Sequence, residues 1–240
     1  MSVEGLDTVE AVEGRARWLF GGAFEKEGVI HPTACVRKAD GAYCALRIEP
    51  RTPKSPHDLF ALFFQRARAD VIVSTGAILR AEPDVRYDLA DSPFGPGLLA
   101  YRASLGKTEP PRVVVLSRRL DLASEHPALR APQVELWSPQ PLSGLGHRPF
   151  TGRPVEAVET LRAEGGLVVV EAGPSVTRGL HAADAIDALY LTTFAGEIDE
   201  ALLAGAAFDT AGIETRLPAA GPPRRVEEPS GPWHFVRRSR

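Results

Sequence analysis

The sequence predicts an α/β fold in three layers, with a mainly parallel central sheet and helices on both of its faces. Short apolar segments typical of buried strands alternate along the chain with longer segments of helical periodicity. Several helical segments lead into the next strand within a few residues, which is typical of parallel sheets covered on both sides. At 240 residues, the chain has a suitable length for one such domain.

The composition is that of an ordinary globular protein, with 44% hydrophobic and 25% charged residues. The formal net charge of −3 provides no basic surface for a phosphate backbone, so we expect no nucleic-acid partner. The apolar segments are too short to cross a bilayer, and residues 1–7 lack the features of a secretory signal. We therefore expect no membrane partner and a cytoplasmic location.

The N-terminal part is expected to form a peripheral helical segment at residues 1–30, followed by the main domain at residues 31–240. Five apolar residues recur at the spacing of one helix face: Val9, Val12, Ala16, Leu19 and Phe20. The main domain should begin with a strand at 33–36, a turn at 38–41 and a second extended segment at 43–48.

Cys35 and Cys44 flank this turn, where they would either form a disulfide across the hairpin or remain two buried thiols. We favour the thiols, because free cysteine is usually buried.

A helix is predicted from Ser55 to about residue 69. Ser55 can accept a hydrogen bond from the first free amides, Pro56 suits the first helical position, and Asp58 complements the positive end of the helix. Its apolar residues form a broad face that we assign to the core: Leu59, Phe60, Leu62, Phe63 and Phe64.

A buried strand at 70–76 follows directly. Residues 82–111 contain many prolines and glycines and are predicted to form a long loop with a short helix at 98–104. The remaining segments predict strands at 112–116, 134–137, 167–170, 188–194 and 233–237, and helices at 154–163 and 174–182.

The strongest candidate site follows the strand at 167–170. There Glu171 precedes a turn containing Gly173, and Pro174 and Ser175 begin a helix whose free amides can bind phosphate. Alternatively, this is an ordinary strand-to-helix turn in which Glu171 merely satisfies helix amides.

Small residues also end the strand at 70–76. Ser74, Thr75 and Gly76 leave room for a pyrophosphate or a nicotinamide, although small residues suit any tight junction. After the strand at 112–116, Ser117 and Arg118 offer a hydroxyl and a guanidinium that suit the 2′-phosphate of NADPH, unless the arginine is only solvated surface charge.

Other motifs carry less information. Asp40 and Gly41 form a common turn pair, which alone indicates geometry rather than catalysis. The sequence contains no phosphate-binding Gly-Lys-Ser/Thr ending and no Gly-x-Ser-x-Gly nucleophile motif. The six histidines have no metal-ligand spacing, so we expect no metal site.

Taken in order, several segments resemble the riboflavin-biosynthesis pyrimidine reductase family, in its C-terminal reductase domain, which is related to dihydrofolate reductase. The similar segments are 38–41, 66–73, 80–83, 114–118, 170–175 and 186–191, and the resemblance spans roughly residues 31 to 238. Order and spacing carry it more than any single motif.

The resemblance implies a dihydrofolate-reductase-like fold and an NADPH-dependent oxidoreductase similar to 5-amino-6-(5-phosphoribosylamino)uracil reductase. It places the pyrophosphate near Ser74, Thr75 and Gly76 and near Gly173, Pro174 and Ser175, with Ser117 and Arg118 on the 2′-phosphate. Asp40 would handle a proton, and Glu171 would orient the substrate or the carboxamide. Gly41, Arg80 and Arg86 would lie on the substrate side.

Three segments depart from the family pattern. Val73–Ala77 reads Val-Ser-Thr-Gly-Ala instead of Val-Gly-Ala-Gly-Thr, and Ala172 replaces a glycine. Residues 84–88 place two aspartates beside Arg86, where the family has basic and hydroxyl residues, and this argues against a strongly anionic substrate.

Two hypotheses follow. The first is an NADPH-dependent reductase of a small pyrimidine, pterin or related carbonyl or imine compound. The second is a non-catalytic relative that binds a nucleotide or a protein, in which the loop at 83–111 fills the site. A homodimer could use residues 189–194 and 233–236, unless these are internal strands.

Overall fold

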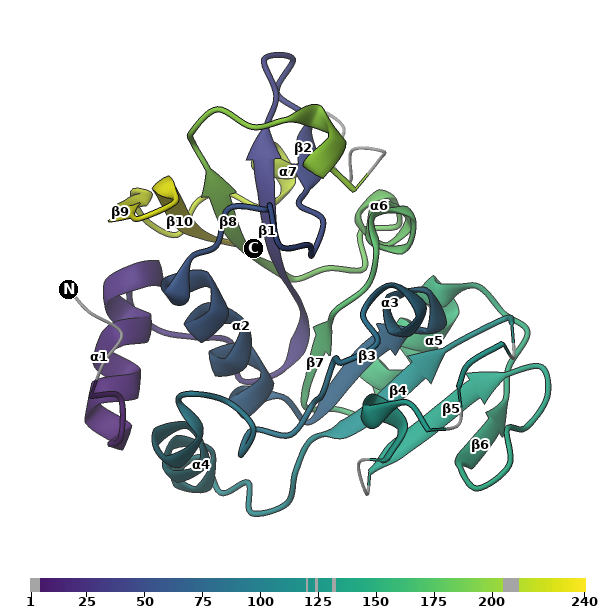
Figure 1. Ribbon diagram of the computed structural model, residues 1–240. Helices are drawn as coiled ribbons and strands as arrows, with labels where there is room; N and C mark the ends of the chain where they lie inside the picture. The colour runs from purple at the N-terminus through teal and green to yellow at the C-terminus, as the bar shows by residue number, and fades with distance from the viewer. Residues whose placement is uncertain (1–4, 120, 124, 131–132, 205–211) are drawn as a thin grey trace.

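The structure is a computed structural model, and it describes residues 5–119, 121–123, 125–130, 133–204 and 212–240. Its ten strands form one sheet in the order β6-β5-β4-β3-β7-β1-β8-β10-β9, with β2 paired to β1 (Figure 1). The strands are β1 (Gly28–Arg37), β2 (Tyr43–Ala45), β3 (Val71–Thr75), β4 (Arg112–Leu116), β5 (Val134–Ser138), β6 (Gly146–Pro149), β7 (Leu167–Val170), β8 (Ala188–Phe194), β9 (Arg224–Glu228) and β10 (Gly231–Ser239). The strands from β6 to β8 pair in parallel, which confirms the mainly parallel sheet.

Helices cover both faces of the sheet, as expected. Successive residues of β7 point to opposite faces, so that Leu167 and Val169 join one core cluster while Val168 and Val170 join the other. The helices that supply the first cluster are α1 (Val9–Phe20), α2 (Pro56–Arg68) and α4 (Gly95–Ser104), and those that supply the second are α5 (Pro154–Ala163) and α6 (Pro174–Ala182). The short helices are α3 (Gly76–Ala81) and α7 (Ile213–Arg216), with 3-10 turns at Pro127–Arg130 and Glu200–Leu202.

Helix α2 begins as the sequence predicts, because Ser55 Oγ accepts a hydrogen bond from the Asp58 amide at 3.1 Å. Its apolar face, however, is divided. Phe60 and Phe64 are fully buried, whereas Leu59 is 41% exposed and Phe63 is half-buried. Only part of this apolar face is therefore fully buried in the core. The more exposed part borders the candidate site described below.

Several elements carry weaker sequence signals and were not predicted. Strand β6 is an edge strand whose polar residues are mostly exposed, so it has no apolar alternation. Helix α3 and strand β9 are similarly short. Strand β1 begins at Gly28, so its first residues precede the expected domain start at 31.

Strands β8 and β10 are internal neighbours in the sheet, and Trp233 is only 1% exposed. The segments at 189–194 and 233–236 are therefore internal strands of the sheet.

The two cysteines lie on adjacent strands without forming a disulfide. Cys35 is opposite Ala45, Cys44 is opposite Val36, and the two thiols belong to different core clusters. Both are free and buried, which confirms the favoured interpretation. In the described part of the chain, no helix has the length and apolarity needed to span a membrane.

Candidate active site

Three neighbouring strands bring most of the predicted site residues to one edge of the sheet. Thr75 at the end of β3 is paired with Leu116 at the end of β4. On the other side of β3, Val73 is paired with Val170, and the Glu171 amide donates to the Val73 carbonyl at 2.8 Å. The predicted bends after β3, β4 and β7 therefore follow level strand ends at the same carboxyl edge, where ligands of parallel sheets bind.

The bends after β3 and β4 are in direct contact and form what we call the cofactor end of this edge. A β-carbon on Gly76 would lie 2.3 Å from Ser117 Oγ, so only glycine fits there. Arg80 donates to Asp121 at 2.9 Å and also lies beside Gly76, so the structure places it at the cofactor end instead of on the substrate side. Arg118 is exposed and has no ion-pair partner among the described residues.

The start of α6 adds an open backbone to this end. Gly173 precedes the helix without a side-chain cap, and a β-carbon there would meet no atom within 4 Å. Ser175 is exposed. The first amides of an uncapped helix are suitable donors for a phosphate group, so this turn fits the predicted pyrophosphate.

The hydroxyl groups at the end of β3 form hydrogen bonds with other residues of the protein. Tyr87, from the loop after α3, donates to Ser74 Oγ at 2.6 Å, and Thr75 Oγ1 accepts from the Ile78 amide at 3.3 Å as the cap of α3. Ser74 is completely buried. Any ligand contact at 74–76 would therefore come mainly from the backbone.

Glu171 is held by a residue that the sequence analysis did not single out. Arg66 on α2 donates to both carboxylate oxygens, at 2.7 and 2.6 Å, and the two side chains are only 5% and 10% exposed. The same guanidinium donates to the Arg86 carbonyl at 2.9 Å and lies over the Tyr87 ring. A bidentate buried pair of this kind fixes the carboxylate rigidly. The only sequence signal for Arg66 was its charge in the last turn of a helix.

A second acidic group lies close to this pair. Glu82 is half-buried at the end of α3, and its pKa is raised to about 7, first by burial and then by the charge of Glu171. This carboxyl group is therefore partly protonated at neutral pH.

Asp58 is a further acid that the sequence analysis read only as a favourable charge at a helix start. Its half-buried carboxyl group bonds to Thr192 on β8, and burial raises its pKa to about 6. Asp58 and Arg66 are eight residues apart on α2, or about 12 Å along the helix. Between them, Leu62 and the partly exposed Leu59 and Phe63 form an apolar wall, and we call this region, from Asp58 to Glu171, the substrate end.

Asp40 does not reach either end. It lies at the exposed tip of the hairpin that joins β1 to β2, where its carboxylate accepts from the Ala42 amide at 3.0 Å (Figure 1). Gly41 has a φ of 86°, which the turn requires. Strand β1 pairs with β7 only as far as Ile30. The last seven residues of β1, at roughly 3.3 Å each, carry the chain well beyond the end of β7. The structure therefore separates Asp40 and Gly41 from Glu171. Arg86 is exposed and pairs with Asp91 at 3.4 Å, so that only its carbonyl contacts the site.

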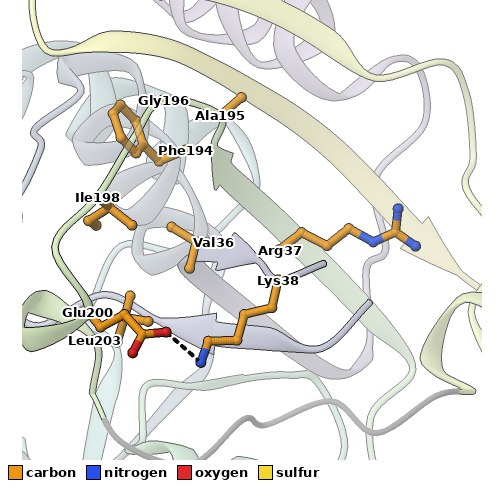
Figure 2. A pocket seen from close by; sticks show the side chains of 9 residues that line it. All are labelled: Val36, Arg37, Lys38, Phe194, Ala195, Gly196, Ile198, Glu200 and Leu203. Atoms are coloured by element: carbon orange, nitrogen blue, oxygen red, sulfur yellow. Dashed lines mark hydrogen bonds and ion pairs between the residues drawn. The ribbon is translucent and has the colours of Figure 1, made fainter. Parts of the chain in front are cut away.

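A separate cavity of about 250 Å³ lies farther along β1 and β8. Val36 and Phe194 are each two residues beyond the paired Ala34 and Thr192, and alternation places them on the same face of the sheet. Figure 2 shows their side chains with Lys38, whose ammonium group is 3.3 Å from a Glu200 oxygen, whereas the Arg37 side chain extends away. Ile198 and Leu203 complete its apolar lining.

Comparison with known proteins establishes the fold. No family model and no curated protein matches the sequence. Among solved structures, Acinetobacter baumannii RibD is 14% identical, with a TM-score of 0.62 over 89% of this chain and 58% of that chain. A pyrimidine reductase-like protein from Corynebacterium diphtheriae is 21% identical, with a TM-score of 0.61 over 94% of this chain and 98% of that one.

A third solved structure, the Thermotoga maritima diaminohydroxyphosphoribosylaminopyrimidine deaminase/5-amino-6-(5-phosphoribosylamino)uracil reductase, is 13% identical with a TM-score of 0.57 over 90% of this chain. This chain spans 57% of the Thermotoga protein and 58% of RibD. The chain thus has the fold of these pyrimidine reductases, which confirms the α/β fold that the resemblance implies.

Proposed function

We propose that this protein is an NADPH-dependent reductase of a small heterocyclic carbonyl or imine compound. One observation carries the proposal: the bends after three neighbouring parallel strands, an uncapped helix start and the carboxyl group of Asp58 lie along one edge of the sheet. The pyrimidine reductases that share the fold support the same reaction class.

The cofactor end would hold NADPH. Gly173 and Ser175 supply backbone donors for the pyrophosphate, and the exposed Arg118 guanidinium would bind the 2′-phosphate. The Ser117 hydroxyl donates to the Arg119 carbonyl at 2.6 Å, so it would have to turn to contact the same phosphate. NADPH would supply the hydride, so the protein has to align the substrate with it and exclude water.

The substrate end would supply the proton. Reduction of a carbonyl or imine group adds a proton as well as a hydride, and the Asp58 carboxyl, with its pKa near 6, can hold that proton close to neutral pH. Glu171 cannot move freely, because Arg66 binds both of its oxygens, so we assign it an orienting role. Leu59 and Phe63 provide an apolar surface for a flat ring.

Titration with NADPH and NADP+, followed by nicotinamide fluorescence, tests the proposal. Both should bind, and Arg118→Ala should weaken NADPH about tenfold while leaving NADH unchanged, since NADH lacks the 2′-phosphate. Arg119→Ala is the matched control, because the neighbouring Arg119 guanidinium contacts Asp121. If neither nucleotide binds at high micromolar concentration, the reductase proposal fails and the non-catalytic alternative is favoured.

A further inference from the structure

We propose that the substrate is an unphosphorylated pyrimidine or fused pyrimidine, neutral or protonated, rather than a sugar phosphate. This inference rests on the proposed reductase function and narrows its substrate class. It follows from how the charged groups at the substrate end are paired.

Each of three cationic side chains at this end already has its own carboxylate. Arg66 binds Glu171 through two hydrogen bonds in a buried pair. Arg86 is 3.4 Å from a carboxylate oxygen of Asp91, and Lys38 is 3.3 Å from one of Glu200. A phosphate dianion would have to displace one of these acids or lie beside it.

Two more carboxyl groups increase the negative charge of the substrate end. Within the described ranges, neither Asp58 nor Glu82 lies within salt-bridge distance of a lysine or arginine. Carboxyl groups in this position favour a ligand that is neutral or that carries a proton, and they oppose a second anion.

At the cofactor end, cationic side chains outnumber the carboxylates that pair with them. Arg80 and Arg119 share the single carboxylate of Asp121, and Arg118 has no ion-pair partner among the described residues. An unpaired guanidinium therefore lies beside the backbone bends of the cofactor end.

The cavity along β1 and β8 combines apolar side chains with charged groups that are already paired. Its lining includes four apolar side chains, Val36, Phe194, Ile198 and Leu203. The Phe194 ring needs glycines around it, because a β-carbon at Gly196 or Gly231 would lie 2.5 or 3.0 Å from ring atoms. The two cations in its lining, Arg37 and Lys38, are paired with Glu214 and Glu200, so a phosphate there would lose its hydration and compete with these carboxylates.

One nearby cation could oppose the inference. Arg47 is exposed and donates its Nε to the carbonyl of the cavity residue Leu203 at 2.7 Å. It has no carboxylate partner among the described residues, so a phosphorylated ligand would have to recruit this guanidinium.

Calorimetry on the full chain saturated with NADP+ tests the inference with a matched pair of probes, uridine and uridine 5′-monophosphate, and with pterin. Uridine or pterin should bind, and the monophosphate should bind at least tenfold more weakly than uridine. Tighter binding of the monophosphate, or no binding of any neutral probe, would overturn the inference. Because NADP+ binding is measured first, failure of the reductase proposal is seen separately.

Charge-neutralising variants sharpen the test. Glu200→Gln frees Lys38 and should strengthen monophosphate binding about threefold while leaving uridine unchanged. Glu197→Gln, an exposed acid outside the cavity lining, is the control and should change neither. Arg47→Ala should also leave both affinities unchanged, and a selective loss of monophosphate binding in this variant would contradict the inference.

Discussion

The two ends of the carboxyl edge differ in how they present polar groups to a ligand. At the cofactor end, the uncapped start of α6 has open space at Gly173, and Arg118 is exposed without an ion-pair partner among the described residues. At the substrate end, helix α2 contributes side chains, and the buried guanidinium of Arg66 is already bound to Glu171. One sheet edge thus carries two different electrostatic environments, because different elements cover its two parts.

The cause of this difference is local. Strand β3 leads directly into helix α3 at Gly76, and β4 leads into the segment that begins with Ser117 and the exposed Arg118. Strand β7 ends beside the C-terminal half of α2, and Arg66 reaches it from there. Backbone donors suit a phosphate of any nucleotide, whereas buried side-chain pairs select a particular ligand. Three predictions test the contrast.

The largest effect is expected at the buried pair of the substrate end. Arg66→Met should lower the free energy of unfolding by about 3–5 kcal/mol, because it leaves the Glu171 carboxylate buried without its partner. Arg66→Met combined with Glu171→Leu should restore most of that loss. Urea unfolding measures both.

Arg86→Met is the control, since the Arg86–Asp91 pair is exposed and should contribute less than about 1 kcal/mol. Equal losses for Arg66→Met and Arg86→Met would show that the two pairs are equally solvated, which would remove the contrast between the two ends.

The second effect concerns Asp58. Asp58→Asn should reduce the rate of NADPH oxidation by about 100-fold, because asparagine cannot transfer a proton. In the wild type, kcat/KM should fall as pH rises through about 6, where the raised pKa of Asp58 places the loss of its proton. Asp84→Asn, an exposed acid on the loop after α3, is the control.

The same substitution has a stability readout that needs no substrate. Because folding raises the pKa of Asp58 from 3.8 to about 6, the folded state binds its proton more tightly, and stability declines as pH rises between these values. Asp58→Asn should therefore be more stable than the wild type at pH 7, by about 1–2 kcal/mol, with no gain below about pH 4. Equal stability at both pH values would show that Asp58 is solvated.

The third effect concerns the attachment of α6, which carries the cofactor end. His181 on α6 lies 3.1 Å from His31 on β1, and burial with the charge of Arg216 lowers the pKa of His181 to about 4. Its unfolded pKa is 6.5, so the unfolded state binds the proton first as pH falls. Stability should decrease below pH 6.5, by about 2 kcal/mol from His181 at about pH 5.

Urea unfolding between about pH 5 and 7.5 measures this loss. His181→Gln should have a shallower pH dependence than the wild type, and His147→Gln, on the edge strand β6, should not. An unchanged slope in His181→Gln would mean that the ring is accessible to water when folded.

Much of the fold could be predicted from the sequence because local signals and tertiary structure agree. Helices α5 and α6 begin at Pro154 and Pro174, which suit a first helical turn, and both end where they were predicted. Strand β6 and helix α3 were missed because short or exposed elements depend on neighbours for their stability and carry little periodicity.

The candidate site could be predicted only in part. The bends after β3, β4 and β7 were recognised because small residues and a proline follow apolar strands. Asp58 was missed because an acid in a first helical turn has an adequate local explanation, and its bond to Thr192 crosses 134 residues of sequence. Asp40 was overrated because an Asp-Gly turn has the same sequence whether or not it lies beside a ligand.

By itself, the sequence determined most of the alternation of strands and helices, the start of α2 and the starts of α5 and α6, since these depend on residues close together in the chain. Only the tertiary structure decided which of the charged groups are neutralised. Arg66 and Glu171 are separated by 105 positions, and their pairing depends on α2 packing beside the end of β7. Periodicity specifies which face of an element is apolar, but the partner of a buried charge depends on which distant segments the fold brings within a few ångströms.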